Sequence, residues 1–311
     1  MSTQMLNGDC RVILTTLPEK YFDCCVTSPP YWGLRDYNVE DQLGLEDLPD
    51  SYVQNLVEVF REVRRVLRDD ATLWLNLGDC YAGGGNYRGV HSLQTLTAKQ
   101  RSNRGSQGLS QVLGPAGKKY GLAAKQLIGI PWRVAFALQQ DGWWLRSDII
   151  WAKPNCMVES IRDRPTRSHE YIFLLAKSQK YYYDYESVKE PAIHEGRVVK
   201  KYSADARNGT SQDPRYTGFL KHDTLIRGRN RRDVWAVTVK PFKGAHFATF
   251  PPDLIEPCIL AGSRKGGTVL DPFAGAGTTL LVANTHGRNA IGIELNKDYV
   301  SLAEKRLRSN R

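Results

Sequence analysis

The segment VLDPFAGAGTTLLVA, residues 269–283, constrains the fold more than any other part of this chain. Its first two residues end a buried strand, Gly275 and Gly277 allow a tight backbone turn, and Thr278 begins a helix. A turn of this kind presents free backbone N–H groups and the positive end of a helix dipole to an anionic or nucleotide-like ligand. The segment therefore predicts an α/β fold with a ligand-binding turn.

The acidic residue Glu294 follows this turn at the end of the next apolar stretch, 17 residues after Gly277. A carboxylate at that place could accept hydrogen bonds from both hydroxyls of a ribose. Leu280 stands where the dinucleotide fingerprint GxGxxG has its third glycine. S-adenosylmethionine has no pyrophosphate that needs such close approach, so the turn favours it over a dinucleotide.

The rest of the chain alternates strand and helix patterns, without internal repeats. The periodicity predicts strands at 20–27, 72–77, 148–152, 171–176 and 289–295, and helices at 51–67, 126–140 and 296–307. Residues 245–262 predict a loop that leads into a helix, in which Pro257 should cause a kink or an early end. A strand, a helix and a strand in succession indicate parallel pairing, although the order of strands in the sheet cannot be read from the sequence.

The positive charge is unevenly distributed, with a net charge of +10 over 311 residues. Residues 83–125 contain seven Lys/Arg and no Asp/Glu, and residues 197–232 contain ten Lys/Arg and three Asp/Glu, so the remainder has a net charge of −4. Such localised charge suits a polyanionic partner, because each neutralised phosphate releases counterions. Two solvated loops are the alternative interpretation.

Cysteine spacing and hydropathy exclude several classes of protein. The six cysteines have no metal-ligand or disulfide spacing, so we expect reduced thiols and no metal. No apolar run of about 18 residues occurs, and the first residues lack the pattern of a secretory signal. We expect a cytoplasmic protein without membrane attachment.

The stretch TSPPYW, residues 27–32, ends the first predicted strand in an unusual way. Pro29 and Pro30 have no N–H group, so the turn presents acceptors: the side-chain oxygen of Ser28 and the Pro29 carbonyl. Acceptors of this kind suit the exocyclic amine of cytosine or adenine, whose N–H groups they could hold while a methyl group is transferred. Tyr31 would stack on a base extruded from the duplex, and Trp32 would support it. The alternative is a strand end whose aromatic residues fill the core.

These motifs resemble those of the beta group of DNA amino-methyltransferases, the N4-cytosine and N6-adenine family. TSPPYW resembles the catalytic (D/N/S)PP(Y/F/W) signature, and DPFAGAGTT resembles the cofactor motif, in the permuted order of that group. GDC at 8–10 and HFATFPP at 246–252 extend the similarity over most of the chain. The resemblance implies an α/β, Rossmann-like S-adenosylmethionine-dependent methyltransferase sheet with circularly permuted motif order and a small target-recognition region.

The resemblance also implies a role for individual residues. It assigns catalysis to Ser28, Pro29, Pro30 and Tyr31. It assigns the S-adenosylmethionine site to Asp9, Thr249, Phe250, Pro251, Asp271, Phe273, Gly275, Gly277, Thr278 and Glu294. Within that site Asp9 would approach the adenine edge, Phe250 would close the pocket and Glu294 would bind the ribose. For Asp9 the alternative is a cap at the start of a helix.

The first residue of the catalytic signature bears on the target base. Family members with Asp there usually methylate adenine N6, whereas members with Ser mostly methylate cytosine N4. Ser28 therefore favours cytosine N4, and adenine N6 is the alternative. A methyltransferase acting on RNA and a DNA-binding subunit without catalytic activity are more remote alternatives.

The predicted organisation divides the chain into five segments. They are a catalytic half of the core (1–82), a basic glycine-rich insertion (83–125), a continuation of the core (126–180), a target-recognition region (181–240) and a cofactor-binding half (241–311). The DNA contacts predicted are Trp32, Arg88, Arg101, Arg104, Lys118, Lys119, Arg227, Arg229, Arg231 and Arg232. DNA is the expected partner, and a homodimer and a cognate restriction endonuclease on another chain stay open.

Overall fold

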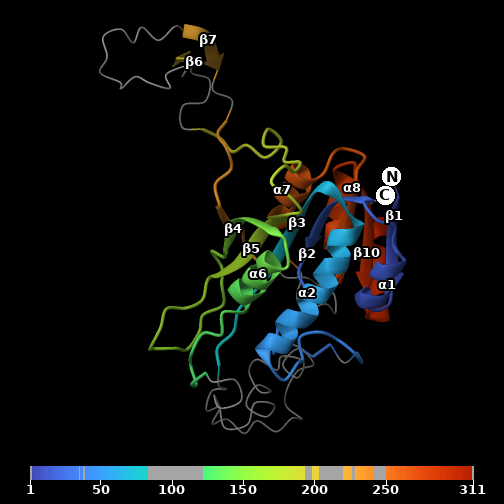
Figure 1. Ribbon diagram of the computed structural model, residues 1–311. Helices are drawn as coiled ribbons and strands as arrows, with labels where there is room; N and C mark the ends of the chain where they lie inside the picture. Colours follow the sequence, from blue (N-terminus) through green and yellow to red (C-terminus); the bar gives the residue numbers. More distant parts are fainter. Residues whose placement is uncertain are drawn as a thin grey trace. The chain divides into compact units, whose positions relative to one another are not determined.

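A computed structural model describes residues 2–34, 36–37, 39–82, 122–192, 198–202, 220–225, 228–240 and 250–309 (Figure 1). The chain divides into two units, a larger one of Met1–Asp184 with Asp233–Arg311 and a smaller one of Tyr185–Arg232. The two units are described separately below.

An eight-stranded mixed sheet, in the order β1-β10-β9-β2-β3-β5-β4-β8, organises the larger unit. The strands are β1 (Thr3–Asn7), β2 (Phe22–Thr27), β3 (Leu67–Leu77), β4 (Trp144–Ala152), β5 (His169–Ala176), β8 (Val234–Ala236), β9 (Thr268–Asp271) and β10 (Asn289–Glu294). All neighbouring pairs are parallel except those that β5 makes with β3 and β4. The predicted parallel pairing of the first two long strands is confirmed, since β2 pairs with β3.

Helices cover both faces of this sheet (Figure 1). One layer consists of α1 (Cys10–Thr16), α2 (Pro49–Val66) and α6 (Ile130–Gln140), and the other of α7 (Pro252–Gly262), α8 (Thr278–Thr285) and α9 (Lys297–Ser309). This three-layer arrangement confirms the predicted α/β class. None of the helices in the described residues is both long enough and apolar enough to cross a lipid bilayer.

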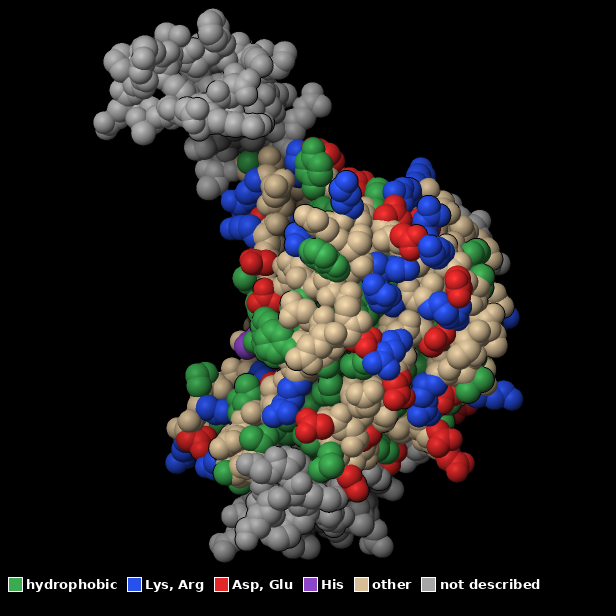
Figure 2. All heavy atoms as spheres, in the orientation of Figure 1, with side chains coloured by type: hydrophobic (Ala, Val, Ile, Leu, Met, Phe, Trp, Pro, Cys, Tyr) green, Lys and Arg blue, Asp and Glu red, His purple; other side chains and the backbone are tan. Residues whose placement is uncertain are grey.

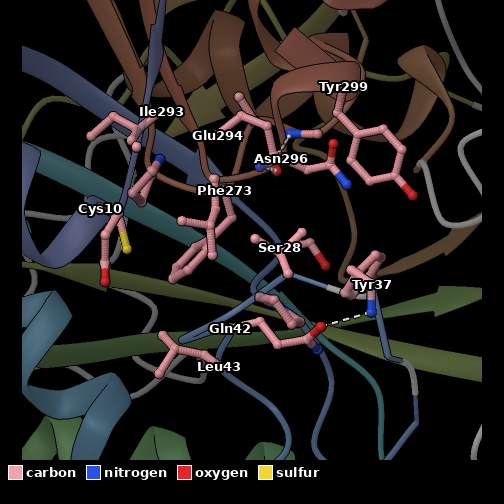
Figure 3. Close-up of a pocket in the computed structure, with 18 of the residues that line it drawn as sticks. Cys10, Ser28, Tyr37, Gln42, Leu43, Phe273, Ile293, Glu294, Asn296 and Tyr299 are labelled. Carbon is pink, nitrogen blue, oxygen red and sulfur yellow. Dashed lines mark hydrogen bonds between the residues drawn. The ribbon is translucent and has the colours of Figure 1, made fainter.

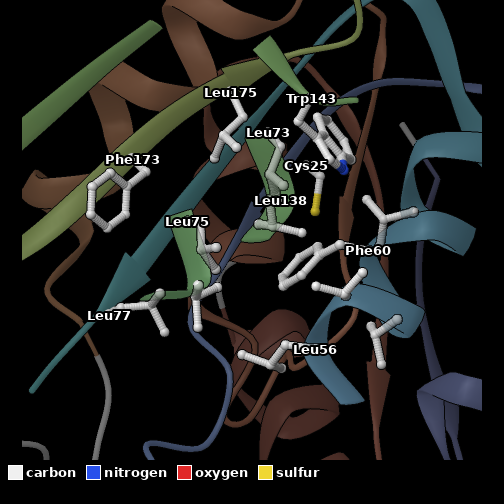
Figure 4. Packing of buried hydrophobic residues seen from close by; sticks show 14 of the residues in the cluster. Cys25, Leu56, Phe60, Leu73, Leu75, Leu77, Leu138, Trp143, Phe173 and Leu175 are labelled. Carbon is white, nitrogen blue, oxygen red and sulfur yellow. The ribbon is translucent and has the colours of Figure 1, made fainter. Parts of the chain in front are cut away.

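The main core lies between the sheet and the layer that contains α2 and α6 (Figure 4). In α2, apolar residues recur every three or four positions, so that Leu56, Phe60 and Val63 are fully buried. They pack with Leu73 and Leu75 of β3, which are also fully buried. This packing holds β3 rigidly, and the end of β3 contributes to the site described below.

One predicted helix begins later than expected, and another does not end early at its internal proline. The helix predicted at 126–140 begins at Ile130, because Asp79 Oδ1 accepts hydrogen bonds of 3.0 Å from the Gly129 and Ile130 N–H groups and thereby sets the first turn. Of the two effects predicted for Pro257, a kink or an early end, the early end is wrong, since α7 continues to Gly262. Its residues around Pro257 are buried, and their packing offsets the lost backbone hydrogen bond.

The smaller unit contains an antiparallel pair, β6 (Val198–Tyr202) and β7 (Leu220–Leu225). Within it, the backbones of Glu190 and Arg229 exchange two hydrogen bonds, of 3.0 and 2.8 Å. Among its described residues, the larger unit shows no segregation of charge on the face seen in Figure 2, where Lys/Arg and Asp/Glu side chains are interspersed. Residues 83–121 of the predicted basic insertion, and with them Arg88, Arg101, Arg104, Lys118 and Lys119, lie outside the described residues.

Candidate active site

The candidate active site lies where four neighbouring strands end. Gly8 and Asp9 follow β1, Glu294 ends β10, Asp271 ends β9, and Ser28 follows β2. These strands are parallel and adjacent, so their carboxyl ends meet at one edge of the sheet. The glycine turn and the segment Ser28–Tyr31, called the catalytic corner below, are therefore brought together from distant parts of the chain.

A pocket opens at this edge, with about 880 Å³ of space that includes open solvent. Figure 3 shows that Ser28, Phe273 and Glu294, from three strand ends, line the same hollow. Of the residues predicted from the sequence, the lining includes Asp9, Ser28, Pro30, Phe250, Phe273, Gly275, Thr278 and Glu294.

The glycine turn has the backbone geometry that its sequence requires. Gly275 and Gly277 have φ angles of +50° and +74°, in the left-handed region that favours glycine. A side chain at Gly277 would also lie 2.9 Å from the Ala303 Cβ of α9. Gly277 thus shapes the turn from outside the pocket, whereas Gly275 lines it.

Glu294 connects the turn to the next helix. Its Oε2 accepts a hydrogen bond of 2.8 Å from the Gly275 N–H, and its Oε1 accepts one of 2.8 Å from the Asn296 N–H. Burial raises the pKa of this carboxyl above its ordinary value. Because each carboxylate oxygen can accept more than one hydrogen bond, both can still accept from a ligand in the pocket.

Asp271 lies behind the pocket wall instead of lining it. It is 1% exposed and accepts hydrogen bonds of 2.6 Å from the hydroxyls of Thr27 and Thr279, and one of 3.1 Å from the Phe273 N–H. The first of these joins β9 to the end of β2 immediately before Ser28. The predicted place of Asp271 among the residues that bind S-adenosylmethionine is therefore corrected, because Asp271 has no surface toward the pocket and instead positions the residues that do.

The buried carboxyl predicts a pH dependence of folding stability. Burial raises the pKa of Asp271 from 3.8 to about 6. The folded chain then binds this proton more tightly than the unfolded chain, so the stabilisation is present below pH 4 and is lost as the pH rises through 6. We expect the unfolding free energy of Asp271→Asn to rise by about 2–3 kcal/mol relative to the natural chain between pH 4 and 7.5. Urea denaturation at both values measures this, and a constant difference would contradict it.

Asp9 is a helix cap, which was the alternative role predicted for it, and it also faces the pocket. It is the N-cap of α1, where its Oδ1 accepts a hydrogen bond of 2.8 Å from the Arg11 N–H, and it lines the pocket. The Arg11 guanidinium donates to both carboxylate oxygens at 2.5–3.0 Å. This pairing holds the Asp9 carboxylate in one orientation at the pocket wall.

The segment before α7 is described only in part. Phe250 lines the pocket, and Pro251 is the N-cap of α7 and contributes no lining surface. Thr249 lies outside the described residues.

The catalytic corner is held from several sides. The Tyr52 hydroxyl of α2 donates a hydrogen bond of 2.8 Å to the Pro30 carbonyl. Pro29 is buried and is not among the residues that line the pocket, and within the described part of the chain no donor reaches its carbonyl. Ser28 lines the pocket. Tyr52 thus occupies the Pro30 carbonyl. The two acceptors predicted for a substrate amine are different atoms, the Ser28 oxygen and the Pro29 carbonyl.

Trp32 does not have the predicted role. It is 2% exposed and belongs to the core, and its indole N–H donates a hydrogen bond of 2.8 Å to the Glu46 carbonyl. The alternative of an aromatic side chain that fills the core therefore holds for Trp32, because a buried ring has no surface to offer to DNA.

Tyr31 lies on the backbone of Gly78, at the end of β3. A Cβ atom at Gly78 would lie 2.5 Å from Cε2 of the tyrosine ring and 2.8 Å from Cδ2. The Tyr31 hydroxyl donates a hydrogen bond of 2.7 Å to Glu170 Oε2. The ring is thus fixed at one face and at its polar end.

The structure adds residues that the sequence reasoning missed. The pocket lining also includes Tyr37, Gln42, Leu43, Ile293, Asn296 and Tyr299 (Figure 3). The turn after Glu294 could have indicated Asn296 and Tyr299, since residues that follow a strand end at this edge face the same crevice. Tyr37, Gln42 and Leu43 lie in a stretch of sequence without a distinctive motif.

The described arginines among the predicted DNA contacts belong to the smaller unit. Arg229 and Arg232 pair with Glu190, with N···O distances of 3.3 and 2.7 Å, and Arg231 lies between them in sequence. Arg227 lies outside the described residues.

This chain matches one family model and several known proteins in sequence. The DNA methylase family model matches residues 22–305. The type II methyltransferase M.SmaI of Serratia marcescens is 48% identical over 306 residues, which cover 98% of this chain and 91% of the relative. The type II methyltransferase M.Cfr9I of Citrobacter freundii is 47% identical over 303 residues, which cover 97% and 87%.

Solved structures share the fold. The PvuII DNA methyltransferase (cytosine-N4-specific) aligns with a TM-score of 0.63 and 17% identity over 98% of this chain and 86% of its own. M1.HpyAVI, solved as a complex with SAM, aligns with a TM-score of 0.51 and 18% identity over 98% of this chain and 100% of its own. The resemblance noted in the sequence is thereby confirmed: the chain belongs to the N6/N4 DNA methylase family and is a DNA methyltransferase.

Proposed function

We propose that this DNA methyltransferase transfers a methyl group from S-adenosylmethionine to the exocyclic N4 amine of cytosine, in a base flipped out of the duplex. The observation that carries this proposal is the position of Ser28, which lines the same pocket as the glycine turn and Glu294. A methyl donor and an amine held by oxygen acceptors could meet there.

The pocket residues fit S-adenosylmethionine. Its sulfonium supplies an electrophilic methyl group. Glu294 would accept hydrogen bonds from the ribose hydroxyls, and Asp9 would face the adenine edge. Phe250 and Phe273 offer apolar surface on the same pocket, and Gly275 leaves room beside them. Carboxylates, aromatic rings and a glycine turn in one pocket suit a nucleoside that also carries a positive charge.

The catalytic corner would act on the amine by positioning. The amine of cytosine is a weak nucleophile because its lone pair is delocalised into the ring. Hydrogen bonds from its two N–H groups to the Ser28 oxygen and the Pro29 carbonyl would turn the lone pair toward the methyl group. Once the methyl group has bonded to the nitrogen, the nitrogen carries a positive charge and releases a proton to solvent, so this step requires no strong base.

Tyr31 would provide a platform for the extruded base. Extrusion costs a few kcal/mol, and stacking on an aromatic ring returns about 1–3 kcal/mol per base. The ring position depends on Gly78, which has no side chain to displace it.

The variant Gly78→Ala tests this geometry. Because the new Cβ would lie 2.5 Å from the Tyr31 ring, the ring must move, and we expect methyl transfer to fall by roughly tenfold to a hundredfold. Affinity for S-adenosylmethionine should stay within twofold, since Gly78 does not line its pocket. Turnover equal to that of the natural chain would contradict the role given to the ring.

Product analysis tests the choice of base. Unmethylated bacteriophage DNA is treated with the purified chain and S-adenosylmethionine, digested to nucleosides and analysed by mass spectrometry. We expect N4-methyldeoxycytidine. N6-methyldeoxyadenosine in its place would overturn the choice of cytosine, and the absence of both would overturn the proposed reaction.

We propose further that the Tyr185–Arg232 unit contributes to target recognition. Residues 197–232, most of which belong to this unit, contain ten Lys/Arg and three Asp/Glu. The similarity to type II methyltransferases also supports a cognate endonuclease, on another chain, that acts on the same DNA sequence.

Salt dependence measures the DNA contacts of this unit. We expect replacement of Arg227, Arg229, Arg231 and Arg232 by glutamine to reduce the slope of log K against log salt by about 0.9 for each phosphate that the variant no longer neutralises. Arg308→Gln, an exposed position on α9, is the control and should leave the slope unchanged. If the slopes of the natural chain, the arginine variant and the control were equal, the four arginines would not contact DNA phosphates.

A further inference from the structure

Glu170 and Lys153 form a polar cluster beside the catalytic corner. Glu170 lies in β5 and Lys153 directly follows β4, and their charged groups form an ion pair. Both side chains are less than one fifth exposed, at 17% and 18%. Asn76 of β3 donates a hydrogen bond of 3.3 Å to the same Glu170 oxygen that accepts from Tyr31. Such a cluster is costly to bury unless its members satisfy one another.

The contacts of this cluster fix the direction of each hydrogen bond. An ionised carboxylate can only accept, so the 2.7 Å contact requires the Tyr31 hydroxyl to donate to Glu170. Asn76 Oδ1 lies 3.1 Å from the same hydroxyl, but the charged acceptor is closer and stronger. Burial, together with the Glu170 charge, raises the pKa of Tyr31 well above its usual value, so the phenol keeps this proton.

The direction of the hydrogen bond from Tyr31 to Glu170 also fixes the direction of the one between Ser28 and Tyr31. Once its proton is directed at Glu170, the Tyr31 oxygen can only accept a hydrogen bond. The Ser28 hydroxyl, 3.4 Å away, is the donor to it. This contact is long, as catalytic hydrogen bonds often are before substrate binds. With its own proton turned toward Tyr31, Ser28 presents only lone pairs to the pocket.

We propose that Glu170 is a positioning residue that acts through the Tyr31 hydroxyl to make Ser28 an acceptor for the substrate amine. The inference rests on the function proposed for Ser28 and deepens it. Without the carboxylate, the Tyr31 proton could point to Ser28, and Ser28 would then donate its own proton into the pocket. A donor there would oppose the N–H groups of the amine.

Lys153 and Asn76 support this role by holding Glu170. The Lys153 ammonium pairs with Glu170 Oε1 and lies 4.1 Å from the centre of the Trp151 ring. Oε2 is left to Tyr31 and Asn76. The two carboxylate oxygens thus have separate partners, and these contacts hold the carboxylate in the orientation in which Oε2 accepts from Tyr31.

A double-mutant cycle with Tyr31→Phe and Glu170→Gln tests the proposal. The readout is the single-turnover rate of methyl transfer from S-adenosylmethionine to unmethylated bacteriophage DNA. We expect each single variant to be slower by roughly tenfold or more, since each removes a hydrogen bond to a charged group. The double variant should be within about twofold of Tyr31→Phe, because residues that act through one contact are not additive. Affinity for S-adenosylmethionine should not change.

Two further variants make the result specific. Glu170→Asp keeps the charge and should recover part of the rate lost in Glu170→Gln. Glu159→Gln is the matched control, because Glu159 pairs with Arg164 in the connection between β4 and β5 and does not contact Tyr31. Its rate should equal that of the natural chain.

Two outcomes would overturn the inference. One is a Glu170→Gln variant as fast as the natural chain, and the other is a double variant whose loss is the product of the single losses. Failure of the proposed function is a different observation, since the natural chain would then methylate no amine.

Discussion

The variant Ser28→Ala is expected to transfer methyl groups roughly a hundredfold more slowly than the natural chain. The serine oxygen is the side-chain acceptor of the catalytic corner that lines the pocket, and alanine offers no acceptor in its place. The amine would then keep one N–H group unpaired, and its lone pair would stay delocalised into the ring. The loss should appear in the rate at saturating DNA and S-adenosylmethionine, because the contact matters most as the new bond forms.

Binding measurements separate this loss from a damaged fold. Calorimetric titration of Ser28→Ala with S-adenosylmethionine should give an affinity within a few fold of the natural value, since Glu294 and the glycine turn are unchanged. Ser301→Ala, on the exposed side of α9, is the matched control and should be fully active. A Ser28→Ala variant with unimpaired turnover would remove the serine from the catalytic machinery.

Local patterns explain why much of the site could be predicted from the sequence. The glycine turn, Glu294 and the catalytic corner each follow a buried strand within a few residues. Parallel strands bring such segments to one edge, and the hydrogen bond from Thr27 to Asp271 shows how closely two of them meet across 244 positions of the chain. The fold class followed from the same patterns, because strand and helix periods differ.

Residues that act through long-range contacts could not be predicted in this way. Glu170 lies 139 positions from Tyr31 and reaches it only because β5 runs antiparallel between β3 and β4. The strand order cannot be read from the sequence, so no pattern links these two residues. The role predicted for Trp32 is wrong for a related reason, since an aromatic residue after a proline pair reads the same whether it faces solvent or the core.

Element ends depend on tertiary contacts as well. β3 begins at Leu67, five residues before the predicted start, because polar residues such as Arg68 and Asp69 conceal its period. α6 begins late because Asp79, 50 positions from Gly129, caps it from outside. At the start of α6, therefore, a distant partner decides the boundary, and local propensity does not.

The variant Glu294→Gln is expected to weaken binding of S-adenosylmethionine by roughly a hundredfold. Glutamine has nearly the same shape, but one of its positions is an NH₂ donor. That group would face a backbone N–H of Gly275 or Asn296, both of which donate to the carboxylate at 2.8 Å. The turn would lose a hydrogen bond, and the ribose hydroxyls would lose a charged acceptor.

Calorimetric titration measures this affinity directly, and the matched control is Glu304→Gln. Glu304 lies on the exposed surface of α9, where it pairs with Arg308 at 3.4 Å, and a surface pair contributes less than about 1 kcal/mol. The control should therefore bind S-adenosylmethionine normally. If Glu294→Gln bound as tightly as Glu304→Gln, the carboxylate would serve only to close the glycine turn, and the ribose would have to be bound elsewhere in the pocket.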